Sequence, residues 1–185
     1  MPGFTIHMAI GKEYIRKNKN KIKDEKEFLK GTIAPDLNKE MTEITKEKSK
    51  THYGKWGKYE VETNIKDFLE DENVDINKDY YKGYLLHLIS DHYFYNKTFK
   101  QEHQKMKLNN DRFYDDYDCL NYDLIKKYNV EILDNIRKYM STDKNNNKPK
   151  YLKIDKVENF IDEMSNIDLD KTIKIIEEKG MGGLK

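Results

Sequence analysis

Hydrophobic residues recur every three or four positions along most of the chain, which is the spacing of an α-helix that buries one face. The pattern predicts helices over residues 4–16, 22–28, 61–69, 78–101, 112–128, 130–140, 154–164 and 169–179. We find no run of residues that alternates between apolar and polar in the way a half-buried strand does. The pattern therefore predicts an all-α protein, built as a single-domain bundle of several helices.

Proline, glycine and polar residues predict where these helices are interrupted. Pro35 disfavours a helical conformation at the residue before it, so we expect Asp36 on a turn that follows a helix. The polar segment 42–50 is expected to be a loop or a short helix. Asp168 is the expected N-cap of the last helix.

Three glycines near the C-terminus predict a flexible tail over residues 180–185. Residues 1–179 then form the single helical domain.

The composition is polar for a folded protein, with 36% hydrophobic and 37% charged residues. The 14 Tyr, 7 Phe and one Trp still supply enough aromatic side chains to build a core. A formal net charge of +1 gives no overall attraction to nucleic acid, and the sequence has no glycine-rich phosphate loop. We therefore expect no nucleic-acid partner.

The single cysteine, Cys119, excludes an intramolecular disulfide framework and a thiolate metal cluster. No segment has the roughly 20 apolar residues of a transmembrane helix. The first ten residues are interrupted by His7, and charges follow them rather than precede them, unlike a signal peptide. We therefore expect a cytoplasmic protein, and its oligomeric state stays open.

The main chemical signal lies in the central helix, in the sequence Tyr-Leu-Leu-His-Leu-Ile-Ser-Asp-His. His87 and Asp91 are four residues apart and so share one helix face within an apolar run. Burying both groups costs free energy unless something satisfies them. A metal ion would do so, because imidazole nitrogen and carboxylate oxygen are both zinc ligands. The alternative is a buried His–Asp hydrogen bond with a structural role only.

Three more residues could join this pair if the fold brings them together, which spacing alone does not show. His7 lies on the inward face of the first helix, Asp36 lies on its turn, and His52 lies near a glycine.

Two other histidines are expected outside the site. His92 is about 100° around the helix from Asp91, so we expect it to pack with Tyr95 or Asn96. His103 lies in a charged run and is expected at the surface.

Four short motifs resemble those of the zinc-dependent phospholipase C family. They are Phe-Thr-Ile-His at His7, Gly-Thr-Ile-Ala-Pro-Asp at Asp36, Lys-Thr-His-Tyr-Gly at His52, and Gly-Tyr-Leu-Leu-His-Leu-Ile-Ser-Asp ending at Asp91. Each motif is weak by itself, but four in this order form a fairly specific set over the first hundred or so residues. The resemblance implies the all-helical fold that this family shares with the zinc nucleases specific for single strands.

The resemblance also implies a ligand set and an activity. Asp36, His52, His87 and Asp91 would hold one metal ion, and Asp91 would bridge to a second ion that His7 also binds. Zinc is the expected metal, as one or two ions, and iron or manganese would also suit these ligands. The implied function is a metal-dependent phosphoesterase in which a metal-activated water attacks a phosphodiester or phosphomonoester. Asp91 and His87 would act catalytically through that water, and the substrate would be a small phosphoester or a phospholipid head group.

The chain departs from the family in two places. Secreted members begin their mature chain with a tryptophan that binds metal, whereas this sequence begins with Met-Pro-Gly. The family's third metal needs two histidines and a glutamate after the bridging aspartate, but only His92 and His103 follow Asp91 here.

A second class of metal-dependent phosphohydrolase, the HD type, is not indicated. It needs an adjacent His-Asp pair in that order, whereas Asp91-His92 has the reverse order.

An alternative therefore stays open, a non-catalytic helical protein with a structural or relict metal site.

Ligating histidines usually donate their second N–H to another group. The candidates for this accepting group are Tyr53, Tyr84 and the acidic run 115–118.

Overall fold

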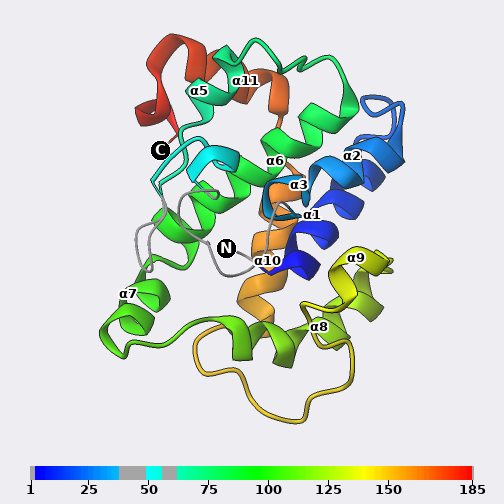
Figure 1. Cartoon of the computed structure of the whole chain (residues 1–185), viewed down its shortest axis with the longest axis vertical. Helices are drawn as coiled ribbons and strands as arrows, with labels where there is room; N and C mark the ends of the chain where they lie inside the picture. The colour runs from blue at the N-terminus through cyan, green and yellow to red at the C-terminus, as the bar shows by residue number, and fades with distance from the viewer. Residues whose placement is uncertain (1–2, 38–48, 56–61, 185) are drawn as a thin grey trace.

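The computed structural model describes residues 3–37, 49–55 and 62–184, and within these ranges the chain is helical and contains no strand (Figure 1). In chain order the elements are α1 (Phe4–Lys17), α2 (Glu25–Gly31), α3 (Ala34–Leu37), α5 (Ile65–Glu70), α6 (Asp79–Tyr93), the π-helix η1 (Phe94–Thr98), α7 (Lys100–Leu108), α8 (Tyr114–Tyr128), α9 (Asp134–Arg137), α10 (Ile154–Ser165), α11 (Leu169–Lys179) and the 3₁₀-helix η2 (Met181–Gly183). The all-α expectation is confirmed for the described residues.

Helix α1 runs through the interior of the molecule. Its side chains are buried without a break from Thr5 to Gly11, and it packs against α8 and α10. Helix α10 meets it with an apolar face whose buried residues are spaced by three and four, namely Val157, Phe160, Ile161 and Met164. This central position of α1 places His7 inside the protein rather than on its surface.

Helices α2 and α6 touch through their backbones at two glycines. A Cβ atom on Gly83 would lie 2.0 Å from the carbonyl oxygen of Phe28, and one on Gly31 would lie 2.0 Å from that of Tyr80. Any larger residue at either position would push the helices apart. The two glycines therefore let the C-terminal end of α2 lie directly against the first two turns of α6.

The start of α6 is tied to the start of α2 by Asp79. Its carboxylate accepts hydrogen bonds from the backbone N–H groups of Lys23, at 2.8 Å, and Asp24, at 2.7 Å. Lys82 donates to the same carboxylate at 2.8 Å. Burial opposes ionisation, but these donors outweigh it and lower the pKa of Asp79.

The prediction of one continuous helix over residues 78–101 is wrong. Helix α6 ends at Tyr93, and the π-helix η1 separates it from α7. The N–H of Phe99 donates to the carbonyl of Phe94 at 2.8 Å, five residues back, and the two buried rings lie 4.4 Å apart. An uninterrupted α-helix would turn these two residues to different faces, so core packing favours the π-turn.

Two other helix boundaries differ from the expectation. The predicted helix over residues 130–140 is reduced to α9, because Asn129 adopts a left-handed conformation with φ 49° and ends α8. The predicted segment 22–28 appears as α2, because the side chain of Asp24 accepts from the N–H of Glu27 and caps the helix there.

The segment that carries Asp36 is the short helix α3, not a turn. Of the predicted helix 61–69, residue 61 lies outside the described residues, and α5 begins only at Ile65. Most of the polar segment 42–50 also lies outside the described residues.

The last two helices match their predictions within one residue, and Asp168 caps α11 by accepting from the N–H of Lys171 at 3.2 Å. After α11 the chain forms η2, and Leu184 is buried. The division into one domain over residues 1–179 and a flexible tail over 180–185 stays a prediction.

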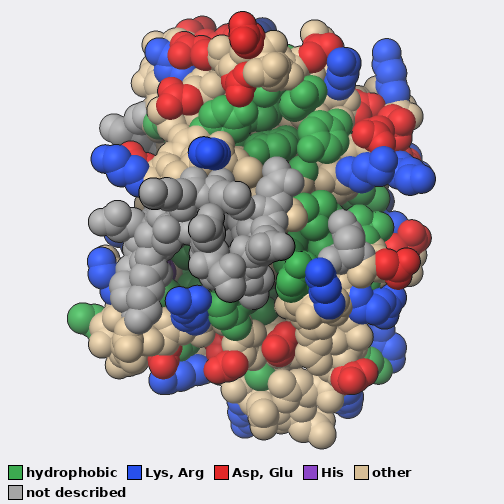
Figure 2. All heavy atoms as spheres, viewed as in Figure 1, with side chains coloured by type: hydrophobic (Ala, Val, Ile, Leu, Met, Phe, Trp, Pro, Cys, Tyr) green, Lys and Arg blue, Asp and Glu red, His purple; other side chains and the backbone are tan. Residues whose placement is uncertain are grey.

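The described part of the face in Figure 2 carries basic and acidic side chains side by side, in keeping with the formal net charge of +1. Among the described residues, no helix combines the length and the apolar character that crossing a membrane requires.

Candidate metal centre

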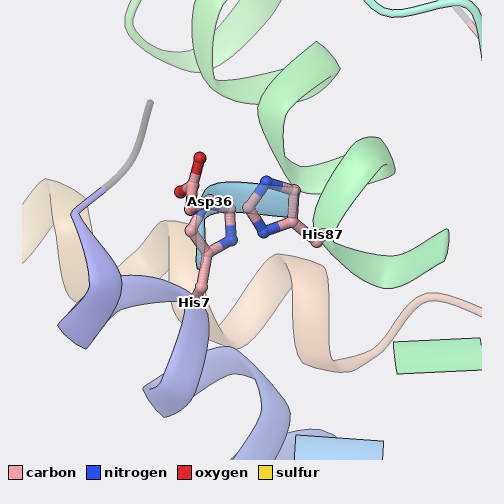
Figure 3. Close-up of side chains that lie close together, drawn as sticks. All are labelled: His7, Asp36 and His87. Carbon is pink, nitrogen blue, oxygen red and sulfur yellow. The ribbon is translucent and has the colours of Figure 1, made fainter. Parts of the chain in front are cut away.

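The fold brings together the five residues that the sequence singled out. They come from four segments, with His7 on α1, Asp36 on α3, His52 on the turn after residue 51, and His87 and Asp91 on α6. None of the five is more than 5% exposed. In Figure 3 the side chains of His7, Asp36 and His87 point toward one another from three different helices.

Three of the ligand atoms form a nearly equilateral triangle. Nε2 of His52 lies 3.2 Å from Nε2 of His87 and 3.3 Å from Oδ2 of Asp91, and the His87 and Asp91 atoms are 3.5 Å apart. Zinc bonds to nitrogen and oxygen are 2.0–2.2 Å long, so the edges of a tetrahedral zinc site are about 3.3–3.6 Å. The three atoms therefore have the separations of one face of a zinc tetrahedron.

The remaining two residues lie on either side of this triangle. Oδ1 of Asp36 is 3.4 Å from Nε2 of His52. Nε2 of His7 is 3.3 Å from Oδ1 of Asp91, the oxygen that does not belong to the triangle. His7, Asp36 and His87 also offer ligand atoms within 4.8 Å of one another. The two oxygens of Asp91 thus face different histidines, as a carboxylate that bridges two ions would require.

The histidines are held by hydrogen bonds on their outer nitrogens. Nδ1 of His87 lies 2.8 Å from the backbone carbonyl of Thr32, and because a carbonyl only accepts, this nitrogen is the donor. The contact between α2 and α6 at their glycines brings this carbonyl to the ring. Nδ1 of His7 lies 3.1 Å from Oγ of Ser90. Nδ1 of His52 lies 3.0 Å from Oγ1 of Thr51.

Tyr84 supports His52 from the next layer. Its hydroxyl donates to the backbone carbonyl of Thr51 at 2.5 Å, and its ring stacks on Phe68 with centroids 5.0 Å apart. Tyr84, one of the supporting groups that the sequence suggested, therefore contacts the residue next to His52 and not His52 itself. Tyr53 instead donates to Asp71 at 2.7 Å.

Several inner atoms of the cluster have unsatisfied hydrogen-bonding capacity. Both oxygens of Asp91 and Nε2 of His7 are buried and have no hydrogen-bond partner among the residues that the structure describes. The contacts between Asp91 and the three imidazoles are 3.3–3.5 Å long, beyond the usual hydrogen-bond range of about 2.7–3.2 Å. A buried carboxylate in such a setting is costly, and a cation at its centre would remove the cost.

The charges of the cluster shift its pKa values strongly. Burial, together with the neighbouring His87, lowers the pKa of His7 to about 4. Burial also lowers the pKa of His87, but Asp91 and Asp36 outweigh it, and the net shift is upward. Burial opposes ionisation of Asp91, yet the surrounding imidazoles hold its pKa well below the usual range. His7 is therefore neutral and Asp91 charged near pH 7, which are the states in which both residues bind metals.

The other two histidines lie outside the cluster. His92 is 3.5 Å from the side-chain nitrogen of Asn96, which also donates to its carbonyl at 3.1 Å. His103 is partly exposed, and its ring centroid lies 4.7 Å from that of Tyr95.

Sequence reasoning missed Thr32, Thr51 and Ser90. A hydroxyl inside the apolar run of α6 was a usable signal for Ser90, whereas Thr32 acts through its backbone and leaves no signal in its side chain.

Comparisons with protein-family models, with curated proteins and with solved structures find no match for this chain.

Proposed function

We propose that this protein is a metal-dependent phosphoesterase of the phospholipase C type, with zinc as the resident metal and iron or manganese as alternatives. The observation that carries the proposal is the triangle of His52, His87 and Asp91, whose edges of 3.2–3.5 Å match one face of a zinc tetrahedron. The order of the four motifs along the chain supports the family assignment.

Each residue has a part that follows from its position. His52, His87 and Oδ2 of Asp91 would hold one ion, with Asp36 beside them. His7 and Oδ1 of Asp91 would hold a second ion. Bound ions of this kind lower the pKa of a water molecule and stabilise negative charge on a phosphoryl oxygen.

The chain's own contribution is to keep these side chains in place before the metal arrives. The carbonyl of Thr32 fixes the ring of His87, and burial of Asp91 excludes competing water from its oxygens. This arrangement suits a small phosphoester or a phospholipid head group, whose phosphate would approach the ions as an anion.

The burial of the cluster favours a second candidate function, a structural metal site in a non-catalytic protein. Structural zinc sites are closed by four protein ligands, whereas catalytic sites keep a position for water or substrate. All five side chains here are at most 5% exposed. The two candidates therefore differ in whether an exchangeable position exists at the bound metal.

The first experiment measures metal content per chain by elemental analysis of tag-free protein purified without chelator. One or two equivalents of zinc, iron or manganese are expected. His87→Ala should lose metal, while His92→Ala is a matched control at a histidine outside the cluster. If no ion is retained or taken up after adding each metal back, or if both variants bind metal like the wild type, the metal centre is refuted.

The second experiment separates the two candidate functions. Loaded protein is assayed with bis(p-nitrophenyl) phosphate and p-nitrophenyl phosphate as diester and monoester probes. Hydrolysis that His87→Ala abolishes and His92→Ala retains supports the phosphoesterase. Stoichiometric metal without hydrolysis, and without any solvent-exchangeable position detected on cobalt-substituted protein, favours the structural site.

A further inference from the structure

Ser90 lies on α6 between His87 and Asp91, and its side chain is fully buried. Serine is a weaker helix former than alanine, so the helix itself gains nothing from it. A buried hydroxyl also costs free energy unless it is hydrogen-bonded. The residue is therefore best explained by the contacts that its hydroxyl makes.

The direction of both contacts is fixed by the chemistry of the partners. Oγ of Ser90 donates its proton to the backbone carbonyl of His87 at 2.8 Å, because that carbonyl can only accept. Only lone pairs of Oγ then remain for Nδ1 of His7, at 3.1 Å. His7 must therefore carry its proton on Nδ1 and present a lone pair on Nε2. That lone pair lies at the atom 3.3 Å from Oδ1 of Asp91.

The stacking of His7 on His87 does not set this orientation. The ring of His7 stacks on the ring of His87 with centroids 3.8 Å apart and an interplanar angle of 14°. Rotating the His7 ring by half a turn about its Cβ–Cγ bond would keep it in the same plane. The stack would survive, but Nδ1 and Cδ2 would exchange places. Two contacts distinguish the orientations, the hydroxyl of Ser90 at Nδ1 and Oδ1 of Asp91 at Nε2, and of these only the hydroxyl lies within the usual hydrogen-bond range.

We propose that Ser90 is a positioning residue that fixes the ring and the tautomer of His7, and so controls binding of a second divalent cation between His7 and Oδ1 of Asp91. This inference rests on the proposed metal centre. It adds that the two ions depend on different supports, because the first ion relies on the Thr32 carbonyl behind His87, and the second ion relies on Ser90.

The chain offers a matched control in Ser165. It is also a fully buried serine near the end of a helix, and its Oγ donates to the carbonyl of Asp162, three residues back, at 2.9 Å. Its Oγ also accepts a hydrogen bond from Lys17 on α1, at 2.7 Å. Ser165→Ala therefore removes the same two kinds of hydrogen bond, one within its own helix and one to α1. Neither of its partners, Asp162 and Lys17, belongs to the metal cluster.

The test uses the full chain and zinc alone as the probe. Zinc is titrated into chelator-treated protein by calorimetry for the wild type, Ser90→Ala, Ser165→Ala, His7→Ala and the double variant Ser90→Ala/His7→Ala. We expect Ser90→Ala to weaken the second zinc by about 10- to 100-fold, as loss of a supporting hydrogen bond does, and to leave the first unchanged. Ser165→Ala should bind both ions like the wild type. In the His7→Ala background, Ser90→Ala should cause no further loss.

A second readout needs no metal. Long-range ¹H–¹⁵N correlation spectra of the metal-free protein should show His7 as a single Nδ1–H tautomer in the wild type and in Ser165→Ala, and as a mixture in Ser90→Ala. A wild-type chain that binds no zinc would sink the proposed metal centre, and these spectra would then judge the positioning of His7 by themselves.

A wild type that takes up a single zinc ion would overturn the inference, and so would any of three results for Ser90→Ala. The first is zinc binding that equals the wild type. The second is an equal loss of affinity from Ser90→Ala with and without His7, which would show a general packing effect. The third is an unchanged single tautomer of His7 in Ser90→Ala.

Discussion

Two buried aspartates of this protein have opposite surroundings. Asp116 on α8 is 3% exposed and accepts three hydrogen bonds from consecutive backbone N–H groups, from Lys150 at 2.7 Å, Tyr151 at 2.6 Å and Leu152 at 2.8 Å. Asp91 on α6 is fully buried, and its oxygens face three imidazole Nε2 atoms at 3.3–3.5 Å. One carboxylate is surrounded by donors, and the other is surrounded by candidate metal ligands.

The difference shows how a buried charge can be assigned a role. Three N–H donors solvate the charge of Asp116 and hold residues 150–152 against α8, so its function is complete within the fold. Asp91 accepts no hydrogen bond from the described residues, and its charge is held instead by the neighbouring imidazoles, which lower its pKa. The proposed cation would complete these surroundings, because the atoms around Asp91 are candidate metal ligands whose separations suit zinc.

The largest expected effect is on zinc-dependent stability in Asp91→Asn. Free zinc at about 1,000 times its dissociation constant should stabilise the wild type by about 4 kcal/mol. This gain should vanish in Asp91→Asn, because one ligand of each ion is lost. In chelator-treated protein the same variant should be no less stable than the wild type, because the amide N–H can donate to an imidazole nitrogen.

Urea unfolding with and without zinc measures both numbers for this variant. Retention of the zinc-dependent gain would remove Asp91 from the metal centre.

Asp116→Asn should show the reverse pattern. The amide cannot accept from all three backbone N–H groups, so we expect a loss of about 3 kcal/mol in the free energy of unfolding, with zinc or without it. The zinc-dependent gain itself should stay at its wild-type value. A variant that instead lost zinc affinity would show that Asp116 also supports the metal cluster.

Gly83→Ala connects helix packing to the cluster, with an intermediate effect. Its Cβ would lie 2.0 Å from the backbone carbonyl oxygen of Phe28, which cannot move aside alone. We expect a loss of about 2 kcal/mol from overpacking. Weaker zinc binding should accompany it, because separating α2 from α6 draws the Thr32 carbonyl away from His87.

The control for this variant is Gly11→Ala on α1, which faces the same helix α2. Its Cβ would meet side-chain atoms of Thr32 at 2.9 Å and Leu29 at 3.0 Å, both of which can rotate. Equal losses from the two alanines, measured by unfolding and by zinc titration, would contradict a special role for the backbone contact.

The sequence predicts the helices better than the breaks between them. Periodicity finds α1, α8, α10 and α11 within two residues, because each buries one regular face. It misses the π-turn after Tyr93, because that turn depends on Phe94 and Phe99 both reaching one core position. Such a preference belongs to tertiary packing and not to the local sequence.

The sequence likewise predicts the residues of the candidate site better than their arrangement in space. His87 and Asp91 were predicted because His and Asp are unusual in an apolar helical run, and the resemblance of their motifs added His7, Asp36 and His52 to the predicted ligand set. Their convergence depends on a contact between the backbones of α2 and α6, and His87 is oriented by a carbonyl that any residue at position 32 would provide. Neither feature can be read from residue types.

The smallest expected effect concerns a third carboxylate, Asp79, which belongs with Asp116 because backbone N–H groups and Lys82 solvate it. Its pKa in the folded protein is below the ordinary value of 3.8, since these donors outweigh the effect of burial. A lowered folded-state pKa stabilises the protein above about pH 3.8, and this stabilisation is lost as the pH falls through the folded-state value.

Asp79→Asn should therefore be less stable than the wild type at pH 6, and the difference should shrink at pH 3. Urea unfolding at both values measures this, with the exposed Asp67→Asn as a control of equal charge change. A difference that stays constant between the two pH values would mean that Asp79 acts through packing and not through its charge.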